Sequence, residues 1–423
     1  MTYKAIKVML KPNNWQTTRL FQYAGVARFA YNWALSKEIE SLKNGKGLIS
    51  DSDLRKEFTK LKKQSKYAWL NTVSNDVPKQ AIKDLVTAYL TYFKERKKPN
   101  YRPYTEKQIE HSKLTGKLLT EYDKRGHPKY KSKRNSQNYG FYNDTEKLVA
   151  TEDTIRISAL LKYGRKDRQA IKSSIKLAEK NRIPTDCKYY NPRITYDGLN
   201  WWISVGIEVK NTDLKYASET EGIGCDLGIK SMVVLSDGID YKNINKSKQI
   251  KQLEKRKRRL QRSISRKYNT NKKGENYQKT FNIKKSEKKL LKLNKRLTNI
   301  RQSYRDSIVE DMISRKPKFI CIEDLNVSGM KKNKHLSKAI QDNGLREFRR
   351  IIEYKTIKHN IPLVIADRWF PSSKLCNECG CIKADLMLKD RTYLCSCGYK
   401  EDRDVNAAKN LKDYGEKELS KRA

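Results

Sequence analysis

Acidic side chains stand at the ends of two apolar segments, where a divalent metal centre could be built. Asp226 lies at the end of GIGCDL (222–227) and Glu323 at the end of KFICIE (318–323). Burying such a charge is costly unless something compensates it. Mg²⁺ prefers hard oxygen ligands and shares them with phosphate, and two ions about 4 Å apart can activate a water and stabilise the leaving oxygen of a phosphodiester. The pattern predicts a two-magnesium centre that hydrolyses phosphodiesters, although each acid taken alone fits an ordinary surface carboxylate equally well.

A third acid is expected from the segment EDRDVNAA (401–408), which offers several candidates. Asp402 suits the N-cap of a helix by its residue type alone. Asp404 falls within the first turn of that helix, and the small residues after it would let the helix approach a sheet closely. We therefore choose Asp404 as the third metal ligand.

A second metal site is predicted by the cysteines, of which five among eight lie in one short stretch. Cys376-x-x-Cys379 and Cys395-x-Cys397 form two knuckles separated by a segment of hairpin length. Four thiolates leave no coordination position for water, so the zinc ion that they predict is structural. Cys381 is a spare thiol that could replace or assist one of the four. Clustered cysteines of this kind favour a reducing compartment over a disulfide framework.

The charge of the chain points to a polyanionic partner. Lys plus Arg total 93 and Asp plus Glu total 48, which leaves a net charge of +45 over 423 residues. Nucleic acid would neutralise this charge through phosphate contacts and counterion release. The alternative is a basic surface that serves only solubility. Two basic runs stand out because almost no acids interleave them. The candidate nucleic-acid contacts are Lys255, Arg256, Lys257, Arg258, Arg259, Lys129, Lys131, Lys133 and Arg134.

The C-terminal half must supply the elements that position the acids. Strands joined by tight turns are followed by strands joined through helices, which predicts a mixed sheet with helices on both faces, the layout of an RNase H-like fold. If the strands ending in Asp226 and Glu323 are parallel neighbours, both acids meet at the carboxyl edge of the sheet. The expected strands are 222–227, 231–235, 239–243, 318–323 and 361–366, and the expected helices are 248–268, 281–315, 344–359 and 403–412.

The N-terminal half reads as a helical region placed between parts of a β domain. A strand at 3–10 is expected to join strands between 139 and 210. Helical spacing covers 14–42, 52–63 and 76–95, and the polar stretch 97–138 is expected to hold one short helix at 105–121. No signal peptide and no apolar run of about 18 residues occur, so we expect a cytoplasmic protein with no membrane partner.

Four segments resemble the TnpB family of transposon-encoded proteins, the ancestors of type V CRISPR effectors. Three match its RuvC motifs, and the fourth precedes the first cysteine knuckle; the similarity is strong from about 219 to 411 and weaker elsewhere. The second knuckle departs from the C-x-x-C that is usual in the family. The segments are GCDLGIK (224–230), IEDLNVSGM (322–330), DRWFPSSKLC (367–376) and DRDVNAA (402–408).

The resemblance implies a domain plan for a chain of mixed α/β content. It implies an RNase H-like RuvC nuclease domain at 213–423, with the zinc ribbon inserted at 372–399. A small β-barrel wedge domain would take 1–12 and 125–212, and a helical recognition lobe with a basic linker would take 13–124.

The resemblance also implies a function. Asp226, Glu323 and Asp404 would be the metal-binding acids of a nuclease that cuts double-stranded DNA at a site chosen by a guide RNA from the transposon end, acting as a single copy in the complex. The alternatives are a compact type V CRISPR effector and a nuclease-inactive, RNA-guided repressor. A DNA transposase of RNase H-like fold fits less well, because a zinc ribbon precedes the last acid.

Overall fold

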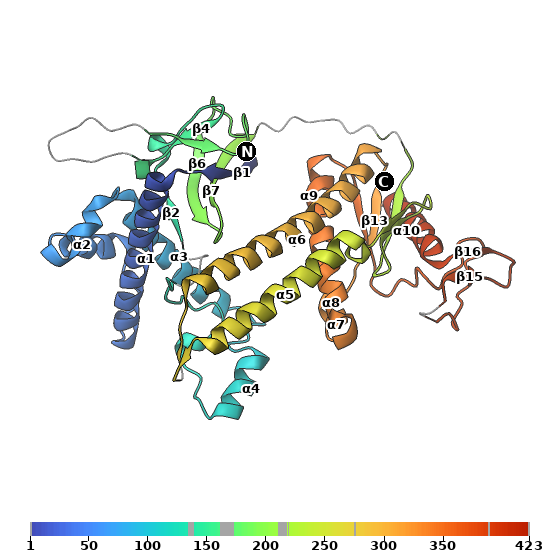
Figure 1. Cartoon of the computed structure of the whole chain (residues 1–423). Coiled ribbons are helices and arrows are strands. Elements are labelled where there is room, and N and C mark those ends of the chain that lie inside the picture. Colours follow the sequence, from blue (N-terminus) through green and yellow to red (C-terminus); the bar gives the residue numbers. More distant parts are fainter. Residues whose placement is uncertain are drawn as a thin grey trace. The chain divides into compact units, whose positions relative to one another are not determined.

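In the computed structural model, which describes residues 2–133, 139–160, 173–209, 218, 220–274, 276–387 and 390–421, the chain divides into two units, Met1–Asn211 and Thr212–Ala423 (Figure 1). Each unit has its own sheet and its own buried apolar clusters. Among the helices of the described ranges, none combines the length and the apolar composition needed to cross a bilayer.

The first unit is organised by a seven-stranded sheet of order β2-β6-β7-β1-β5-β4-β3. Its first strand, β1, pairs antiparallel with β7 from Thr2 opposite Val209 to Leu10 opposite Trp201, so the N-terminal strand lies in the same sheet as the later ones. The outer strands are β2 and β3, and no ladder joins these two within the described residues. The strands are β1 (Thr2–Lys11), β2 (Gly140–Tyr142), β3 (Val149–Ala150), β4 (Thr154–Arg156), β5 (Ile175–Leu177), β6 (Tyr189–Tyr196) and β7 (Trp201–Val209).

Helices α1 (Asn14–Lys43), α2 (Asp51–Leu61) and α3 (Asp76–Arg96) share one apolar core with this sheet. The N-terminus of α1 is fixed by a capping box, in which Asn13 accepts from the Gln16 backbone and Gln16 bonds back. Helix α4 (Glu106–Thr115) is shorter than the helix expected over 105–121, because Gly116 adopts the left-handed conformation (φ 67°) that ends helices.

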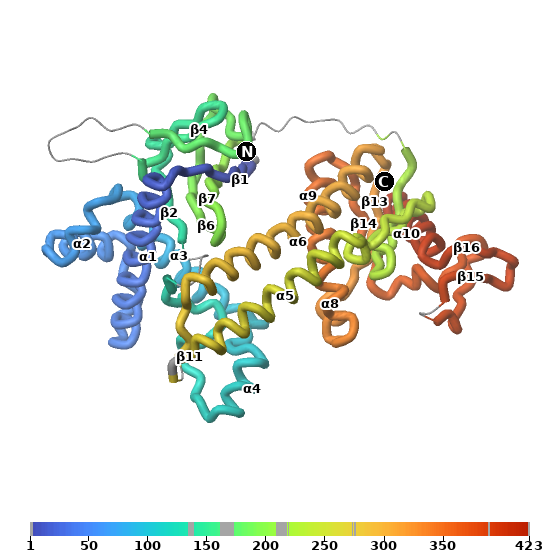
Figure 2. Tube along the Cα trace, viewed as in Figure 1, coloured from blue at the N-terminus to red at the C-terminus, as the bar shows by residue number. Residues whose placement is uncertain are grey.

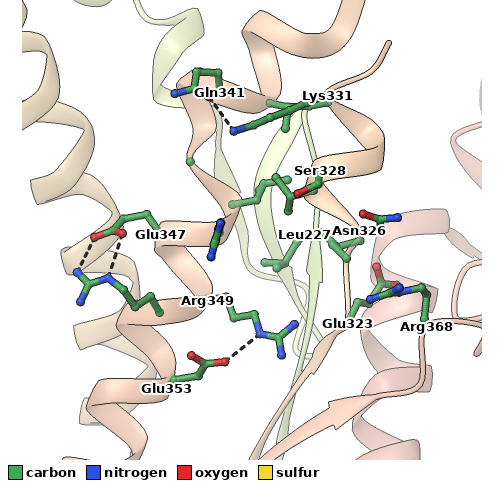
Figure 3. A pocket seen from close by; sticks show the side chains of 17 residues that line it. Leu227, Glu323, Asn326, Ser328, Lys331, Gln341, Glu347, Arg349, Glu353 and Arg368 are labelled. Atoms are coloured by element: carbon green, nitrogen blue, oxygen red, sulfur yellow. Dashed lines mark hydrogen bonds and ion pairs between the residues drawn. The ribbon is translucent and has the colours of Figure 1, made fainter. Parts of the chain in front are cut away.

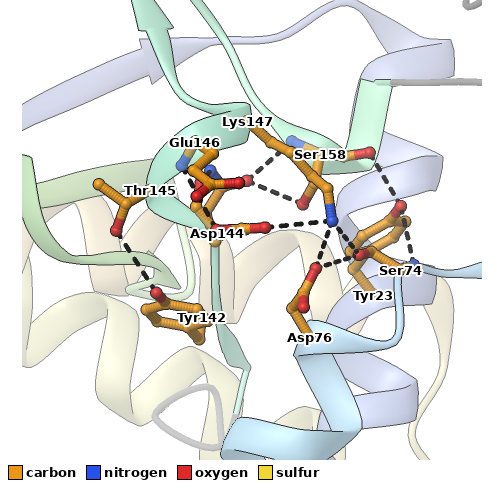
Figure 4. A network of polar contacts seen from close by, with 10 residues as sticks. Tyr23, Ser74, Asp76, Tyr142, Asp144, Thr145, Glu146, Lys147 and Ser158 are labelled. Carbon is orange, nitrogen blue, oxygen red and sulfur yellow. Dashed lines mark hydrogen bonds and ion pairs between the residues drawn. The ribbon is translucent and has the colours of Figure 1, made fainter.

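A polar network centred on Lys147 ties the start of α3 to the segment after β2 (Figure 4). The Lys147 ammonium lies 2.5 Å from an Asp76 oxygen and 3.2 Å from an Asp144 oxygen. Nearby, the Tyr23 hydroxyl donates to the Ser158 carbonyl and accepts from the Ser74 backbone amide. These bonds satisfy polar groups next to the core, so they fix how helices and sheet meet within this unit.

The second unit contains a five-stranded mixed sheet of order β10-β9-β8-β13-β14. Strands β8, β9 and β10 pair antiparallel, whereas β8, β13 and β14 pair in parallel, as the sequence predicted. The strands are β8 (Ile223–Leu227), β9 (Ser231–Leu235), β10 (Asp240–Lys242), β13 (Ile320–Glu323) and β14 (Leu363–Ala366).

Helices cover both faces of this sheet (Figure 2). One face packs on α6 (Phe281–Ser314) and α9 (Leu345–Lys358), and the other packs on α10 (Arg403–Ser420). Helix α5 (Lys248–Thr270) pairs with α6 through a separate apolar cluster. The remaining helices and strands are α7 (Val327–Met330), α8 (Lys334–Asn343), β11 (Lys272–Lys273), β12 (Asn276–Tyr277), β15 (Thr392–Leu394) and β16 (Lys400–Asp402), with 3-10 turns at Ser65–Thr72, Glu121–Asp123, Thr145–Lys147, Ser158–Leu160 and Ile244–Lys246.

Helix α10 lies unusually close to β8 because Gly224 has no side chain. A Cβ atom at Gly224 would stand 2.0 Å from the Ala408 carbonyl oxygen and 2.5 Å from the Lys412 nitrogen, both in the helix backbone. Neither atom can rotate away, so any side chain here must push the helix off the sheet.

We expect Gly224→Ala to destabilise the second unit by about 3 kcal/mol or more, as an overpacked contact. Gly25→Ala in α1 is the matched control, because a Cβ there meets no atom within 4 Å; it should be stabilising by roughly 0.5–1 kcal/mol. Urea unfolding followed by circular dichroism measures both. Equal effects of the two substitutions would contradict the close contact.

Candidate functional site

Strand alternation aims the two strand acids at the same helix. In β8, Ile223, Cys225 and Leu227 belong to the cluster with α6 and α9, so Asp226 faces the α10 side. In β13, Cys321 belongs to the cluster with Leu411 of α10, so Glu323, two residues on, faces the same side. The parallel register sets Ile322 opposite Cys225, which makes the two acids neighbours at the carboxyl edge.

Asp404 approaches the same edge from the first turn of α10. Asp402 is the N-cap of this helix, and its side chain accepts from the backbone nitrogens of Asp404 and Val405 at 2.9 and 3.3 Å. Capping therefore occupies Asp402 and leaves Asp404 as the helix acid beside the sheet. Ala408, one turn further, lies against β8 and sets the closeness of the approach.

Asp226 is affected by its burial and by the charges of the other two acids. Burial among protein atoms raises the pKa of Asp226 well above its usual range, and the charges of Glu323 and Asp404 raise it further, while Arg403 opposes them. Asp226 still keeps part of its surface open to solvent. Burial also raises the pKa of Glu323. Crowded carboxylates that resist ionising form a site whose charge a cation would neutralise.

Polar partners hold two of the acids. The buried hydroxyl of Ser372 donates to Glu323 Oε1 at 2.5 Å. Asp404 Oδ1 accepts from Arg403 Nη2 at 3.1 Å, and its Oδ2 lies 3.7 Å from Arg391 Nη1. Arginine charges thus balance part of the acidic cluster.

The carboxylates differ from the other candidate ligands in chemistry and in grouping. Within the described ranges, the group of three or more metal-ligand side chains with mutually close donor atoms is a set of cysteines, and the three acids are not in it. Hard carboxylate oxygens are nevertheless the donors that Mg²⁺ prefers.

The cysteine group consists of Cys376, Cys379, Cys395 and Cys397. The Sγ atoms of Cys376 and Cys397 are 3.8 Å apart, and those of Cys379 and Cys395 are 3.5 Å apart. Tetrahedral Zn–S bonds of about 2.3 Å place sulfurs roughly 3.8 Å apart, so the group fits zinc. The backbone N–H of Cys397 lowers the pKa of Cys395 to about 6, whereas hydrogen bonding to Cys395 raises the pKa of Cys397 to about 12 and burial raises the pKa of Cys376. Cys381 is exposed and lies outside the group.

A loop links the cysteine group to the acids. The buried side chains of Asn406 and Asn410 in α10 both donate to the Leu375 carbonyl, at 2.8 and 2.7 Å, and Asn410 also donates to the Ser372 carbonyl at 2.8 Å. Leu375 precedes Cys376, and Ser372 bonds Glu323. The loop therefore connects the cysteine group to Glu323 and to the helix that carries Asp404.

An open depression of about 720 Å³ adjoins Glu323 (Figure 3). Strand ends and the helices after β13 form its walls, and basic side chains outnumber acidic ones in its lining. The charged lining residues are Glu323, Lys331, Arg346, Glu347, Arg349, Arg350, Glu353 and Arg368. Such a surface suits an anionic chain that must reach the acids.

The basic residues singled out in the sequence fall into different environments. In α5, four of the five are exposed and Lys257 is half-buried. In the other run, Lys129 and Lys133 are exposed, whereas Lys131 is half-buried with its ammonium 3.7 Å from the centre of the Tyr31 ring. Arg134 lies outside the described residues.

Several residues of the site were missed in the sequence. Ser372, Arg403 and Asn406 stand inside the matching motifs and Asn410 follows the last of them, but their types alone assign no partner. Arg349 gave no signal, because an arginine on an amphipathic helix is ordinary.

Comparison with known proteins places both groups of candidate ligands inside matched regions. Residues 204–334 match the family model OrfB_IS605, described as "Probable transposase", and residues 346–411 match the Cas12f1-like TNB domain. The first range contains Asp226 and Glu323, and the second contains the four cysteines and Asp404. A third model, the OrfB_IS605 "Helix-turn-helix domain", matches residues 1–47. The structure forms one strand and one long helix there, not two helices joined by a turn.

Two curated relatives match along nearly the whole chain. A "Putative RNA-guided DNA endonuclease" of Streptomyces pristinaespiralis is 28% identical over 96% of this chain and 88% of its own length. The "Putative RNA-guided DNA endonuclease InsQ" of Escherichia coli K12 is 24% identical over 96% and 91%. A solved Cas12f1–sgRNA–target DNA complex is 14% identical over 98% of this chain and 99% of its own, at a TM-score of 0.33.

Proposed function

The chain belongs to the TnpB family, and from this membership we propose that it is an RNA-guided DNA endonuclease that hydrolyses both strands of its target in one magnesium-dependent centre. The relatives named as RNA-guided DNA endonucleases support this activity.

One observation carries the catalytic assignment. Asp226, Glu323 and Asp404 come from three elements that are far apart in the sequence, yet the charges of the other two raise the pKa of Asp226. A protein accepts that electrostatic cost at a functional site. The favoured reading is a metal-binding trio, because three unrelated surface carboxylates would not both bury Asp226 and set two further acids close enough to raise its pKa.

The residues of the chain perform distinct parts of the reaction. Bound between the three acids, two magnesium ions would supply an activated water and would stabilise charge on the leaving oxygen. Ser372 donates to one oxygen of Glu323 and so leaves the other free to serve as a metal ligand. Arg403 donates to Asp404 and balances part of the negative charge of that acid.

The domain plan of the sequence is proposed on the same basis. The second unit, from about 213, would be the RuvC nuclease domain, with its zinc ribbon at 372–399. Residues 1–12 and 125–212 would form the wedge domain, and 13–124 the recognition lobe with its basic linker. The four-thiolate group would hold structural zinc, supported by its sulfur spacing.

Guide RNA and target DNA are the proposed partners, bound by one copy of the protein. The exposed basic residues of α5 offer phosphate contacts, and so do Lys129 and Lys133. The half-buried Lys131 is held over the Tyr31 ring, so we assign it a weaker part in RNA contact.

We expect the purified protein to carry one defined RNA, because a charge of +45 is balanced by a polyanion. Sequencing of that RNA should give a scaffold followed by a guide, and the loaded protein should cut plasmids that contain the guide's target. RNA affinity should fall steeply with salt, as phosphate contacts do.

Replacing Arg256 and Arg259 with glutamate should weaken RNA binding, whereas the same change at the exposed Lys56 and Lys60 of α2 should weaken it less. RNA copied from a repeat array would instead favour a CRISPR effector. Protein free of RNA at low salt, without affinity for transcripts of its own locus, would contradict RNA guidance.

A further inference from the structure

Trp369 presents a large aromatic ring to solvent beside the acidic centre. Its exposed fraction is 85%, the highest among the exposed large apolar side chains of the described residues. It follows β14 by three residues, and its backbone N–H donates to Asp367 Oδ1 at 2.8 Å, which fixes the turn that presents the ring. An exposed tryptophan on a fixed turn offers a flat face on which a ligand can stack.

Two arginines stand next to this ring. Asp324, the residue after Glu323, accepts from Arg349 Nη1 and from Arg368 Nη2, each at 2.5 Å. This shared carboxylate holds both guanidiniums in place. Arg349 Nε also donates to Glu353 at 2.9 Å. Each guanidinium has five N–H donors, so donors remain on both for a further anionic ligand, and a phosphate group matches their planar geometry.

The depression beside Glu323 and the tryptophan share two arginines. Arg349 and Arg368 line the depression that contains Glu323, shown in Figure 3, and they also line a second one of about 510 Å³ that contains Trp369. The two arginines therefore stand between Glu323 and the aromatic ring.

We propose that Trp369, Arg349 and Arg368 form a subsite for a single strand of DNA, in which the ring stacks on a base and the guanidiniums hold a phosphate next to the scissile one. The subsite rests on the proposed nuclease function, which explains why an unpaired strand must reach Glu323. The arginines select an anionic chain, and the ring selects unpaired bases, because paired bases hide their faces in the duplex. Trp369 is thus a positioning residue.

The test uses the guide-loaded protein and its duplex target. Trp369→Ala should slow cutting by roughly tenfold or more, the scale of one lost base–aromatic stack, with target affinity nearly unchanged because guide pairing provides it. Trp369→Phe should restore most of the rate. In the Asp226→Asn background, the emission of Trp369 is the difference between the tryptophan emission of the protein that keeps Trp369 and that of the Trp369→Phe protein. Target DNA should quench this emission.

Ile357→Ala is the control. Ile357 of α9 is likewise strongly exposed, with an exposed fraction of 77%, but it lies outside both depressions. It should cut at the original rate. The subsite is overturned if Trp369→Ala cuts as fast as this control and target DNA does not quench the Trp369 emission in the Asp226→Asn background. It is also overturned if Trp369→Ala changes only the mass of the complex, because the ring would then be a protein contact. In both cases the protein would still cut DNA in a manner that depends on Asp226. Failure of the unaltered protein to cut would instead contradict the proposed function itself.

Discussion

Asp226→Asn is expected to abolish DNA cleavage and at the same time to stabilise the metal-free protein. Loss of a ligand that orders the reacting phosphate should cost several kcal/mol of transition-state stabilisation, or about a thousandfold in rate. The stabilisation follows from the raised pKa of Asp226. Above the ordinary pKa of an aspartate, the folded protein retains the proton that the unfolded chain releases, so stability falls as the pH rises through that window.

A neutral asparagine removes this cost, so the melting temperature without magnesium should rise by about 2–4 °C for each kcal/mol relieved. Calorimetry at neutral pH and a plasmid-cutting assay measure the two effects. Asp402→Asn is the matched control: asparagine keeps the N-cap of α10, so cutting should persist. Rapid cutting by the Asp226 variant, or loss of cutting in the Asp402 control alone, would overturn the choice of acids.

Removal of zinc is expected to slow cleavage strongly without releasing the guide RNA. Cys376→Ser should reduce bound zinc from about one ion per chain to none, as measured by mass spectrometry of the metal. Hydrogen exchange should then rise in 371–399, because the loop that bonds Asn406 and Asn410 is no longer held. Since Ser372 of that loop orients Glu323, cutting should fall by roughly a hundredfold.

Cys381→Ser is the control for this experiment, because Cys381 lies in the same stretch but outside the four-sulfur group. It should retain zinc, hydrogen-exchange protection and cutting. Zinc retained by the Cys376 variant but lost from the Cys381 variant would show that the ligand set is wrong.

The mixed sheet of the second unit could be predicted because its signals are local. Apolar strands that end in acids, tight turns and amphipathic helices predicted β8 and β13 as parallel neighbours, and the observed register confirms this. In the first unit the sequence predicted strands at 139–143, 147–151, 154–158 and 201–209, and it missed β6 for a physical reason. It contains Pro192, which argues against a strand, and Asn191 adopts a positive φ of 45° where the pairing with β7 shifts register.

The partners within the site could not be predicted, because they depend on distant side chains. Ser372 and Glu323 are 49 positions apart, and no periodicity relates them. The spacing of the cysteines pointed to zinc, but nothing in it indicated that two asparagines of α10 would bond the loop before Cys376. Only packing of α10 on the sheet creates that network.

The contact between β8 and α10 can form only near the end of synthesis of the chain. The strand is made first and the helix last within the second unit, and Gly224 meets Ala408 across 184 positions (408 − 224). Contacts so remote in sequence form late. While the ribosome is still extending the chain, the emerging molecule contains Asp226 and Glu323 but lacks Asp404. If the three acids form the proposed nuclease centre, premature termination upstream of codon 404 would yield a product that cannot cut the chromosome.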